Sequence, residues 1–298
     1  MTKPVPRSVQ EYLDQLRQEF AGEDPALAQD ALYDAEEYLR GELHQHPDRT
    51  EEQVLAAIAT TYGAPEEVAE AYRATEAKVQ LALRTPRPKK RRTVIGRFFS
   101  VMSDPRAYSS LFYMLLAMFT GIFYFTWAVA GTALSAGLLV LIIGLPFLLL
   151  FLGSTRLLSL VEGRIVETLL GVRMPRRPVH PGASRPFWER VKEVFTDHRT
   201  WTTLLYMVLQ MPLGVIYFTL AVSLGSTALA LIFSPIGRLF DNGLWITLDD
   251  ATVYTVPWIL TPFASALGVV LLVGLMHAAK GIGYVHGHIA KTLLVQSD

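Results

Sequence analysis

One apolar segment occurs twice in this chain, and this duplication limits the possible fold more than any other feature. Residues 104–129 and 197–222 align without a gap at a shift of 93 residues, and 13 of the 26 positions are identical. The identities include paired Asp, Arg, Gly, Tyr and Thr, which a shared apolar composition does not explain. We therefore treat the second part of the chain as an internal repeat.

Both copies are apolar over a length that can cross a bilayer, which takes about 20 residues. The predicted spans, which begin a few residues after the paired Asp and Arg, contain no Asp, Glu, Lys or Arg. This absence argues against a coupled transporter or a channel, although a lipid carrier would not need such residues. The N-terminus has no apolar core, so we expect no cleavable signal peptide. With two further apolar segments, the predicted spans are about 108–130, 134–153, 203–224 and 258–278.

The end of each copy also repeats, but at a larger shift. Residues 161–170 match residues 285–294 at a shift of 124, with six identities in ten positions. The second copy therefore carries 31 additional residues within about 225–257. This comparison divides the membrane part into repeat 1 at 94–186 and repeat 2 at 187–298.

The distribution of charge predicts the orientation in the membrane. Basic residues gather at 87–97, at 156–199 and near the C-terminus, whereas the insertion has one Arg and three Asp. By the positive-inside rule, both termini lie in the cytoplasm and the insertion lies outside. Both copies start inside, so they are parallel repeats related by an axis along the membrane normal. We expect a multi-pass protein of a bacterial cytoplasmic membrane.

A short amphipathic segment precedes each copy, at 94–103 and at 187–196. Both have the pattern of helices that lie in the membrane interface. Because they join the spans to the soluble part of the chain, we expect them to couple the two.

The first 86 residues form a separate acidic domain. They carry 17 acidic and 8 basic residues, a net charge of −9, which the rest of the chain balances. Ser8 with Glu11, and Thr50 with Gln53, have the spacing of helix capping boxes. The pattern predicts a four-helix bundle, joined to the membrane part by a basic linker at 87–93. Its charge indicates a protein partner, or serves solubility alone.

The fold class predicted from these observations is an all-α membrane protein. It consists of a small cytoplasmic helical bundle and four transmembrane helices in two parallel repeats with interfacial amphipathic helices.

The two copies share a stripe of aromatic and small residues that lies on one helix face. In one interpretation the two stripes face each other and pack the centre of the bundle. In the other they line a pocket for a small amphiphile or lipid, with Gln210 as its strong hydrogen-bonding group. The stripes consist of Tyr113, Ala117, Gly121 and Tyr124 in the first copy and Tyr206, Gln210, Gly214 and Tyr217 in the second.

The insertion alternates apolar and polar residues before Asp249-Asp250, which suits a β-hairpin or a sheet edge on the outer membrane face. Its aromatic residues favour the interface. It is either a lid over the bundle or a sensing element for envelope or lipid state. The candidate ligand-binding residues of the whole chain are Tyr113, Tyr124, Tyr206, Gln210, Tyr217, Trp245 and Trp258.

No sequence motif for catalysis, nucleotide binding or metal binding is present. His286 and His288, with His277, could form a metal site. However, Glu162 stands at the position of His286 in the other copy, and we expect no carboxylate near these histidines. The sequence therefore predicts no catalytic residue, no cofactor and no metal, and hence no enzyme.

The N-terminal motifs YLDQLRQEF, DAEEYLRGELHQH and EEQVLAAIATTYGAPEEVAEAYR resemble the HAAS domain, the helix-turn-helix-associated alpha-helical signalling domain, over about residues 8–80. The resemblance implies a cytoplasmic domain linked to a PadR-like transcription regulator. The candidate partner-binding residues in this domain are Tyr12, Leu16, Glu36, Glu37, Tyr62, Glu66 and Glu67.

Residues 94–295 resemble the sensor transmembrane domain at the front of many actinobacterial histidine kinases. The similarity lies in the repeated D-x-R-x-(Y/W)…Y…G…Y pattern and in EGRIVETLLG at 162–171. The sequence lacks the dimerisation helix and ATPase domain of those kinases, so we expect the output to be protein binding.

Together the two resemblances imply a membrane sensor that relays a membrane or envelope signal to a PadR-like regulator. The expected partners are this regulator, membrane lipid and a second copy of the chain, with no direct binding of nucleic acid. The alternatives are a lipid-handling or transporter-accessory membrane protein and a structural dimeric scaffold.

Overall fold

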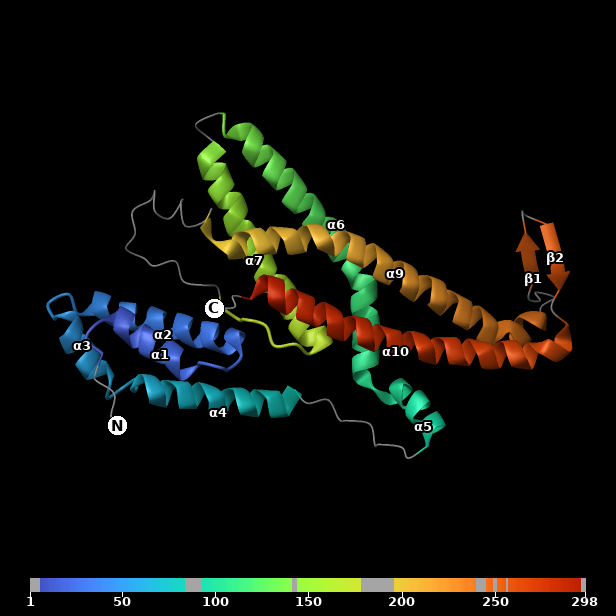
Figure 1. The fold of residues 1–298 in the computed structure, drawn as a ribbon, viewed down its shortest axis with the longest axis horizontal. Coiled ribbons are helices and arrows are strands. Elements are labelled where there is room, and N and C mark those ends of the chain that lie inside the picture. Colours follow the sequence, from blue (N-terminus) through green and yellow to red (C-terminus); the bar gives the residue numbers. More distant parts are fainter. Residues whose placement is uncertain are drawn as a thin grey trace.

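A computed structural model describes most of the chain and shows its helices in two groups (Figure 1). Residues 87–92 of the predicted basic linker and residues 187–195 of the predicted interfacial helix lie outside the described residues. The described residues are 6–83, 93–140, 144–177, 196–239, 245–248, 251–255 and 257–295.

The N-terminal group is a bundle of four helices, as the capping signals predict. The Ser8 side chain accepts a hydrogen bond from the Glu11 backbone N–H, and Thr50 and Gln53 form a reciprocal capping box. Leu16 and Leu39 are fully buried in the shared core. The helices are α1 (Val9–Glu19), α2 (Pro25–Gln45), α3 (Glu51–Ile58) and α4 (Pro65–Leu83).

The second group contains four helices that are long and apolar enough to cross a membrane. Asp104 and Asp197 cap the first helix of each repeat with their side chains, as the repeated Asp predicts. The all-α membrane class is therefore confirmed for the described part of the chain. The four helices are α6 (Pro105–Leu138), α7 (Gly144–Leu170), α9 (His198–Arg238) and α10 (Thr261–Leu294).

These helices extend beyond the predicted spans, and the predicted boundaries are wrong at several ends. The first span is expected to end near residue 130, but α6 continues through Gly131 to Leu138. A Cβ atom on Gly131 would lie 2.0 Å from the Phe151 ring, so this glycine allows α6 and α7 to pack closely. Likewise α9 continues to Arg238, so the first part of the predicted insertion is helical.

The remainder of the insertion contains a β-hairpin, one of the two forms that its alternating pattern suits. Strands β1 (Trp245–Leu248) and β2 (Ala251–Thr255) pair antiparallel. The hairpin lies at the far end of the α9–α10 pair, next to the short 3₁₀ helix η2 (Trp258–Leu260) (Figure 1). The N-terminal bundle lies near the C-terminal ends of α7 and α10, away from the hairpin (Figure 1).

The predicted amphipathic segment at 94–103 is helical, as α5 (Val94–Phe99) and the 3₁₀ helix η1 (Ser100–Ser103). The His277 ring of α10 lies 3.0 Å from the Phe98 carbonyl oxygen through Nε2 and stacks on the Phe98 ring. The segment therefore packs against α10, while its location in a membrane interface stays a prediction.

The two repeats cross through their matched glycines. A Cβ atom on Gly121 would lie 2.6 Å from the Gln210 carbonyl oxygen, and one on Gly214 would lie 2.3 Å from the Ala117 carbonyl oxygen. Positions 117 and 210, like positions 121 and 214, are equivalent in the repeat. The same backbone approach is thus made twice, which is the signature of a two-fold relation between the repeats.

The ion pairs between the repeats obey the same relation. Lys280 of α10 lies 2.6 Å from Asp104, and Arg156 of α7 lies 3.0 Å from Asp197. Lys280 and Arg156 are equivalent at the shift of 124 residues. Burial opposes ionisation of Asp104, but the hydrogen bonds from Lys280 and from the Arg106 N–H prevail, and the Asp104 pKa is lowered. Each repeat therefore neutralises the carboxylate that caps the first helix of the other repeat.

We expect Gly214→Ala to destabilise the crossing of α6 and α9, because the added Cβ overlaps the Ala117 carbonyl. Overpacking of this kind costs about 1–3 kcal/mol. The matched control is Gly137→Ala, where a Cβ meets no atom within 4 Å. Thermal unfolding of the purified variants in detergent measures the difference. Equal midpoints for the two variants would contradict the close crossing.

Candidate functional site

A cluster of polar side chains is buried where the four long helices meet. It contains Tyr113 of α6, Glu162 of α7, Tyr206 and Gln210 of α9, and His286 of α10. Each of these residues is at most 2% exposed. A carboxylate in such surroundings is costly unless its oxygen atoms are hydrogen-bonded, so its partners decide what the cluster can do.

The Glu162 carboxylate is shared by the two repeats. The Tyr113 hydroxyl donates a hydrogen bond to Glu162 Oε1 at 2.8 Å, and the Tyr206 hydroxyl donates to the same oxygen at 2.9 Å. Gln210 Nε2 lies 3.1 Å from the Tyr113 hydroxyl and 3.4 Å from Glu162 Oε1. These bonds join α6, α7 and α9.

His286 completes the cluster from α10. Its Nε2 atom lies 2.6 Å from the Tyr113 hydroxyl and 3.0 Å from the Tyr206 hydroxyl. When both hydroxyl protons are donated to Glu162, Nε2 carries the imidazole proton and donates it to the tyrosine oxygens. The other ring nitrogen, Nδ1, then accepts from the Tyr217 hydroxyl at 3.3 Å. One directional chain of hydrogen bonds therefore runs from Tyr217 to Glu162.

The cluster consists of equivalent positions from the two repeats, which carry different side chains at one pair. Tyr113 and Tyr206 are equivalent in the repeat, and Glu162 and His286 are equivalent at the larger shift. Tyr124 lies beside the Glu162 carboxylate, as its counterpart Tyr217 lies beside His286. The duplication therefore placed an acid and a base at matching positions, with two tyrosine hydroxyls between them.

Two predictions from the sequence are wrong at this site. The spans do contain an acid, because α7 runs unbroken through Glu162 to Leu170. A carboxylate does lie near His286, through the two shared tyrosines. Hydropathy ended the span too early, at the polar residues that follow 153. The repeat alignment, which pairs Glu162 with His286, was the signal that could have revealed the site.

The structure also separates the candidate ligand-binding residues. The five on α6 and α9 gather at the cluster, where their hydroxyl and amide groups bond directly to neighbours, so the geometry favours the packing interpretation. Trp258 is 75% exposed at the other end of α10, roughly 40 Å from His286 at about 1.5 Å per residue. Trp245 lies in β1, in the hairpin at the same end of α10 (Figure 1).

The unused hydrogen-bonding capacity of the cluster lies on two acceptors. Within the described part of the chain, Glu162 Oε2 and Gln210 Oε1 are buried without a hydrogen-bond partner. No group of three or more His, Cys, Asp or Glu side chains suited to a metal occurs among the described residues. The arrangement can hold a proton, and it can change its bonding when that proton or a helix moves.

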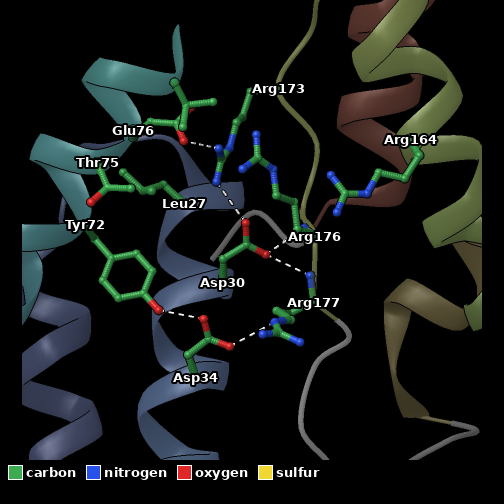
Figure 2. Close-up of a pocket in the computed structure, with 11 residues that line it drawn as sticks. Leu27, Asp30, Asp34, Tyr72, Thr75, Glu76, Arg164, Arg173, Arg176 and Arg177 are labelled. Carbon is green, nitrogen blue, oxygen red and sulfur yellow. Dashed lines mark hydrogen bonds and ion pairs between the residues drawn. The ribbon is translucent and has the colours of Figure 1, made fainter. Parts of the chain in front are cut away.

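A second set of contacts joins the N-terminal bundle to the end of α7. The chain turns at Gly171, which has a positive φ of 72°, and continues beside α2 and α4. Asp30 Oδ1 accepts hydrogen bonds from the backbone N–H groups of Arg176 at 2.6 Å and Arg177 at 2.8 Å. Arg173 donates to Asp30 Oδ2 at 2.8 Å (Figure 2).

Further charged pairs surround Asp30. Arg173 also pairs with Glu76 of α4, and Arg177 lies 2.9 Å from Asp34 (Figure 2). Burial raises the pKa of Asp30, against the lowering effect of the two backbone N–H groups and of Arg173. Burying these charges costs desolvation free energy, and the hydrogen bonds and ion pairs at Asp30 offset that cost.

Additional contacts fix the bundle to α10. Lys291 donates a hydrogen bond to Asp24 at 2.7 Å. Ala26 is fully buried in the same apolar cluster as Ala290, Leu294 and Met174. The bundle thus rests on the ends of both α7 and α10, the two helices that supply Glu162 and His286.

The candidate partner-binding residues occupy different environments. Tyr12 and Leu16 lie inside the bundle core, where the Tyr12 hydroxyl donates to the Gly63 carbonyl. Tyr62 stacks on Tyr38, and Glu36 pairs with Arg40. The exposed members of the set are Glu37, Glu66 and Glu67.

Comparison with known proteins identifies the membrane part. Residues 113–294, more than half of the chain, match the family model described as Putative sensor. The chain therefore belongs to this family, and it is a multi-pass membrane protein of the sensor type. The matched region contains all five buried cluster residues and leaves out the N-terminal bundle. No curated protein and no solved structure matches the chain.

We expect Tyr113→Phe and Tyr206→Phe to be coupled, because each hydroxyl donates to the same Glu162 oxygen. Loss of both donors should destabilise the protein by about 0.5–3 kcal/mol more than the sum of the single changes. Unfolding free energies of the four forms in detergent micelles give this value. Tyr284→Phe, at a residue 65% exposed on α10, is the control. Strict additivity would contradict the shared carboxylate.

Proposed function

We propose that this protein is a membrane sensor that relays a membrane or envelope signal to a PadR-like transcription regulator through its N-terminal bundle. The signal changes the packing of the buried cluster, and the bundle presents that change to the regulator. The protein acts by binding and not by catalysis, from a bacterial cytoplasmic membrane with both termini inside.

The observation that carries this proposal is that the bundle rests on the helices that meet in the cluster. Glu162 lies in α7, and Arg173, shortly after the end of α7, pairs with Asp30 and Glu76 of the bundle. His286 lies in α10, and Lys291 in its last turn pairs with Asp24. A small shift of either helix in the membrane must therefore alter the contacts that position the bundle.

The choice of partner rests on the N-terminal sequence. The bundle has the helices expected from its resemblance to the HAAS domain, which implies a PadR-like regulator. Its exposed acidic residues, such as Glu37, Glu66 and Glu67, can meet basic groups of such a protein. The positive-inside rule supports the cytoplasmic placement of this surface.

The test is co-purification of the full chain with the winged-helix regulator from the same cell. We expect Glu162→Gln, which keeps the side-chain volume but removes the charge, to change the amount of bound regulator severalfold, because it alters the balance between two packings of the cluster. Tyr284→Phe, outside the cluster, should leave it unchanged. A transcript controlled by the regulator should respond in parallel.

Other results would contradict the relay. Co-purification of an ATPase, or movement of a lipid across the bilayer by the purified protein, would favour a lipid-handling or transporter-accessory role. Unchanged transcripts after removal of residues 1–86 would favour a structural scaffold.

A further inference from the structure

We propose that the face of the N-terminal bundle formed by Gln29, Asp30, Asp34 and Glu76 is a binding site for an arginine-containing peptide. Residues 173–177 of the chain itself are its resident ligand, and a basic segment of a protein partner takes their place. We call this surface the acidic face. The peptide site stands on the contacts described below, and only the exchange with a partner rests on the proposed function.

The acidic face binds the backbone of residues 173–177 as a peptide site would. Asp30 accepts the successive backbone N–H groups of Arg176 and Arg177, at 2.6 and 2.8 Å. Gln29 Nε2 donates to the Arg177 carbonyl oxygen at 2.7 Å. Backbone groups are the same in every sequence, so these three bonds suit any segment that bends as Arg176 and Arg177 do and has a free N–H at both positions.

The side-chain contacts supply the preference for arginine. The guanidinium group of Arg173 lies between Asp30 and Glu76, and its side chain is only 9% exposed. The guanidinium group of Arg177 pairs with Asp34, which also accepts a hydrogen bond from the Tyr72 hydroxyl at 2.6 Å (Figure 2). Paired carboxylates match the planar guanidinium group better than an ammonium group.

An apolar position lies between the arginines. Met174 is fully buried and packs in the apolar cluster that contains Ala26 of the bundle. The resident ligand therefore has the order Arg-Met-Pro-Arg-Arg, with the first and last arginine on carboxylates and the methionine in the apolar contact.

The contact between the resident ligand and the bundle leaves a cavity and unpaired polar atoms, which suits a ligand that can be exchanged. A cavity of about 320 Å³ lies between the resident segment and the bundle, lined on one side by Asp30, Asp34 and Glu76 (Figure 2). The buried Nε atoms of Arg173 and Arg176 lack a hydrogen-bond partner. Burial of charge with incomplete pairing yields little net free energy, so the tether of the chain supplies much of the occupancy.

The chemistry of the acidic face selects the class of occupant. The surface presents three carboxylates and an amide to its ligand, which repels phosphate groups and favours a cationic peptide. Anionic lipid would be attracted to the arginines of the resident segment, such as the half-exposed Arg177, and not to the acidic face. A basic protein segment is therefore the occupant that the contacts fit.

The test measures binding of a fluorescein-labelled peptide with the sequence GVRMPRR, residues 171–177, to the full chain in lipid nanodiscs. The double variant Arg173→Gln/Arg177→Gln loosens the resident ligand. We expect it to bind the peptide at least about tenfold more tightly than the wild-type chain, because the open fraction rises. Asp30→Asn added to this variant should abolish the gain.

Two matched controls accompany this measurement. Arg164→Gln removes an arginine that lines the same cavity but bonds to Glu167 of its own helix, so it should leave peptide binding unchanged. A peptide with glutamine at each arginine should not bind. Equal binding of the peptide to the wild-type chain and the double variant would overturn the proposal, as would a gain that survives Asp30→Asn.

A second readout needs no variant. In the wild-type chain the resident ligand should be protected from trypsin after Arg173 and Arg176, and excess peptide should increase cleavage there severalfold. No increase at saturating peptide would overturn the proposal. An increase caused by vesicles of anionic lipid and not by peptide would also overturn it, in favour of a lipid headgroup site. Peptide binding without a co-purifying regulator would contradict the relay alone.

Discussion

The sharing of the Glu162 carboxylate by Tyr113 and Tyr206 is the interaction on which the membrane part depends. A carboxylate buried among apolar helices is tolerated only when hydrogen-bond donors surround it. Here the donors come from both repeats, and His286 binds the same hydroxyls from the opposite side. The four helices therefore cannot separate without exposing an acid to an apolar environment. That requirement fixes their arrangement more strongly than apolar packing, which lipid could replace.

The duplication explains how such a site arises. The matched glycines at 121 and 214 and the matched ion pairs at Asp104 and Asp197 make the two repeats interchangeable in backbone and in charge. Substitution at one member of a pair then produces chemical difference without disturbing the fold. Glu162 corresponds to His286, and Gln210 corresponds to Ala117 in the other copy. The two repeats share one backbone arrangement but carry different side chains at these positions. The hydrogen bonds of the cluster therefore run in one direction, from Tyr217 to Glu162.

The contacts at Asp30 extend this logic beyond the membrane part. The segment after α7 turns at Gly171 and places three arginines against an acidic bundle, while α10 contributes Lys291. Because these attachments begin on the two helices that supply Glu162 and His286, the membrane cluster and the soluble bundle are mechanically continuous. The buried charges in these contacts are only partly compensated. The bundle is therefore held in place, but another basic segment can still compete for the contact at Asp30.

The sequence by itself determined the helices, their caps, the four apolar spans and the two-fold repeat, because hydropathy, capping residues and duplication are visible in the sequence. For the insertion it left a β-hairpin and a sheet edge open. It also indicated that the tyrosine stripes belong together. Only the tertiary structure decided that Glu162 lies inside the bundle and that Asp30 receives residues 173–177. Both depend on side chains far apart in the chain, whose burial is set by packing and not by neighbouring residues. A carboxylate near a helix end has the same local pattern whether it meets water or two tyrosines.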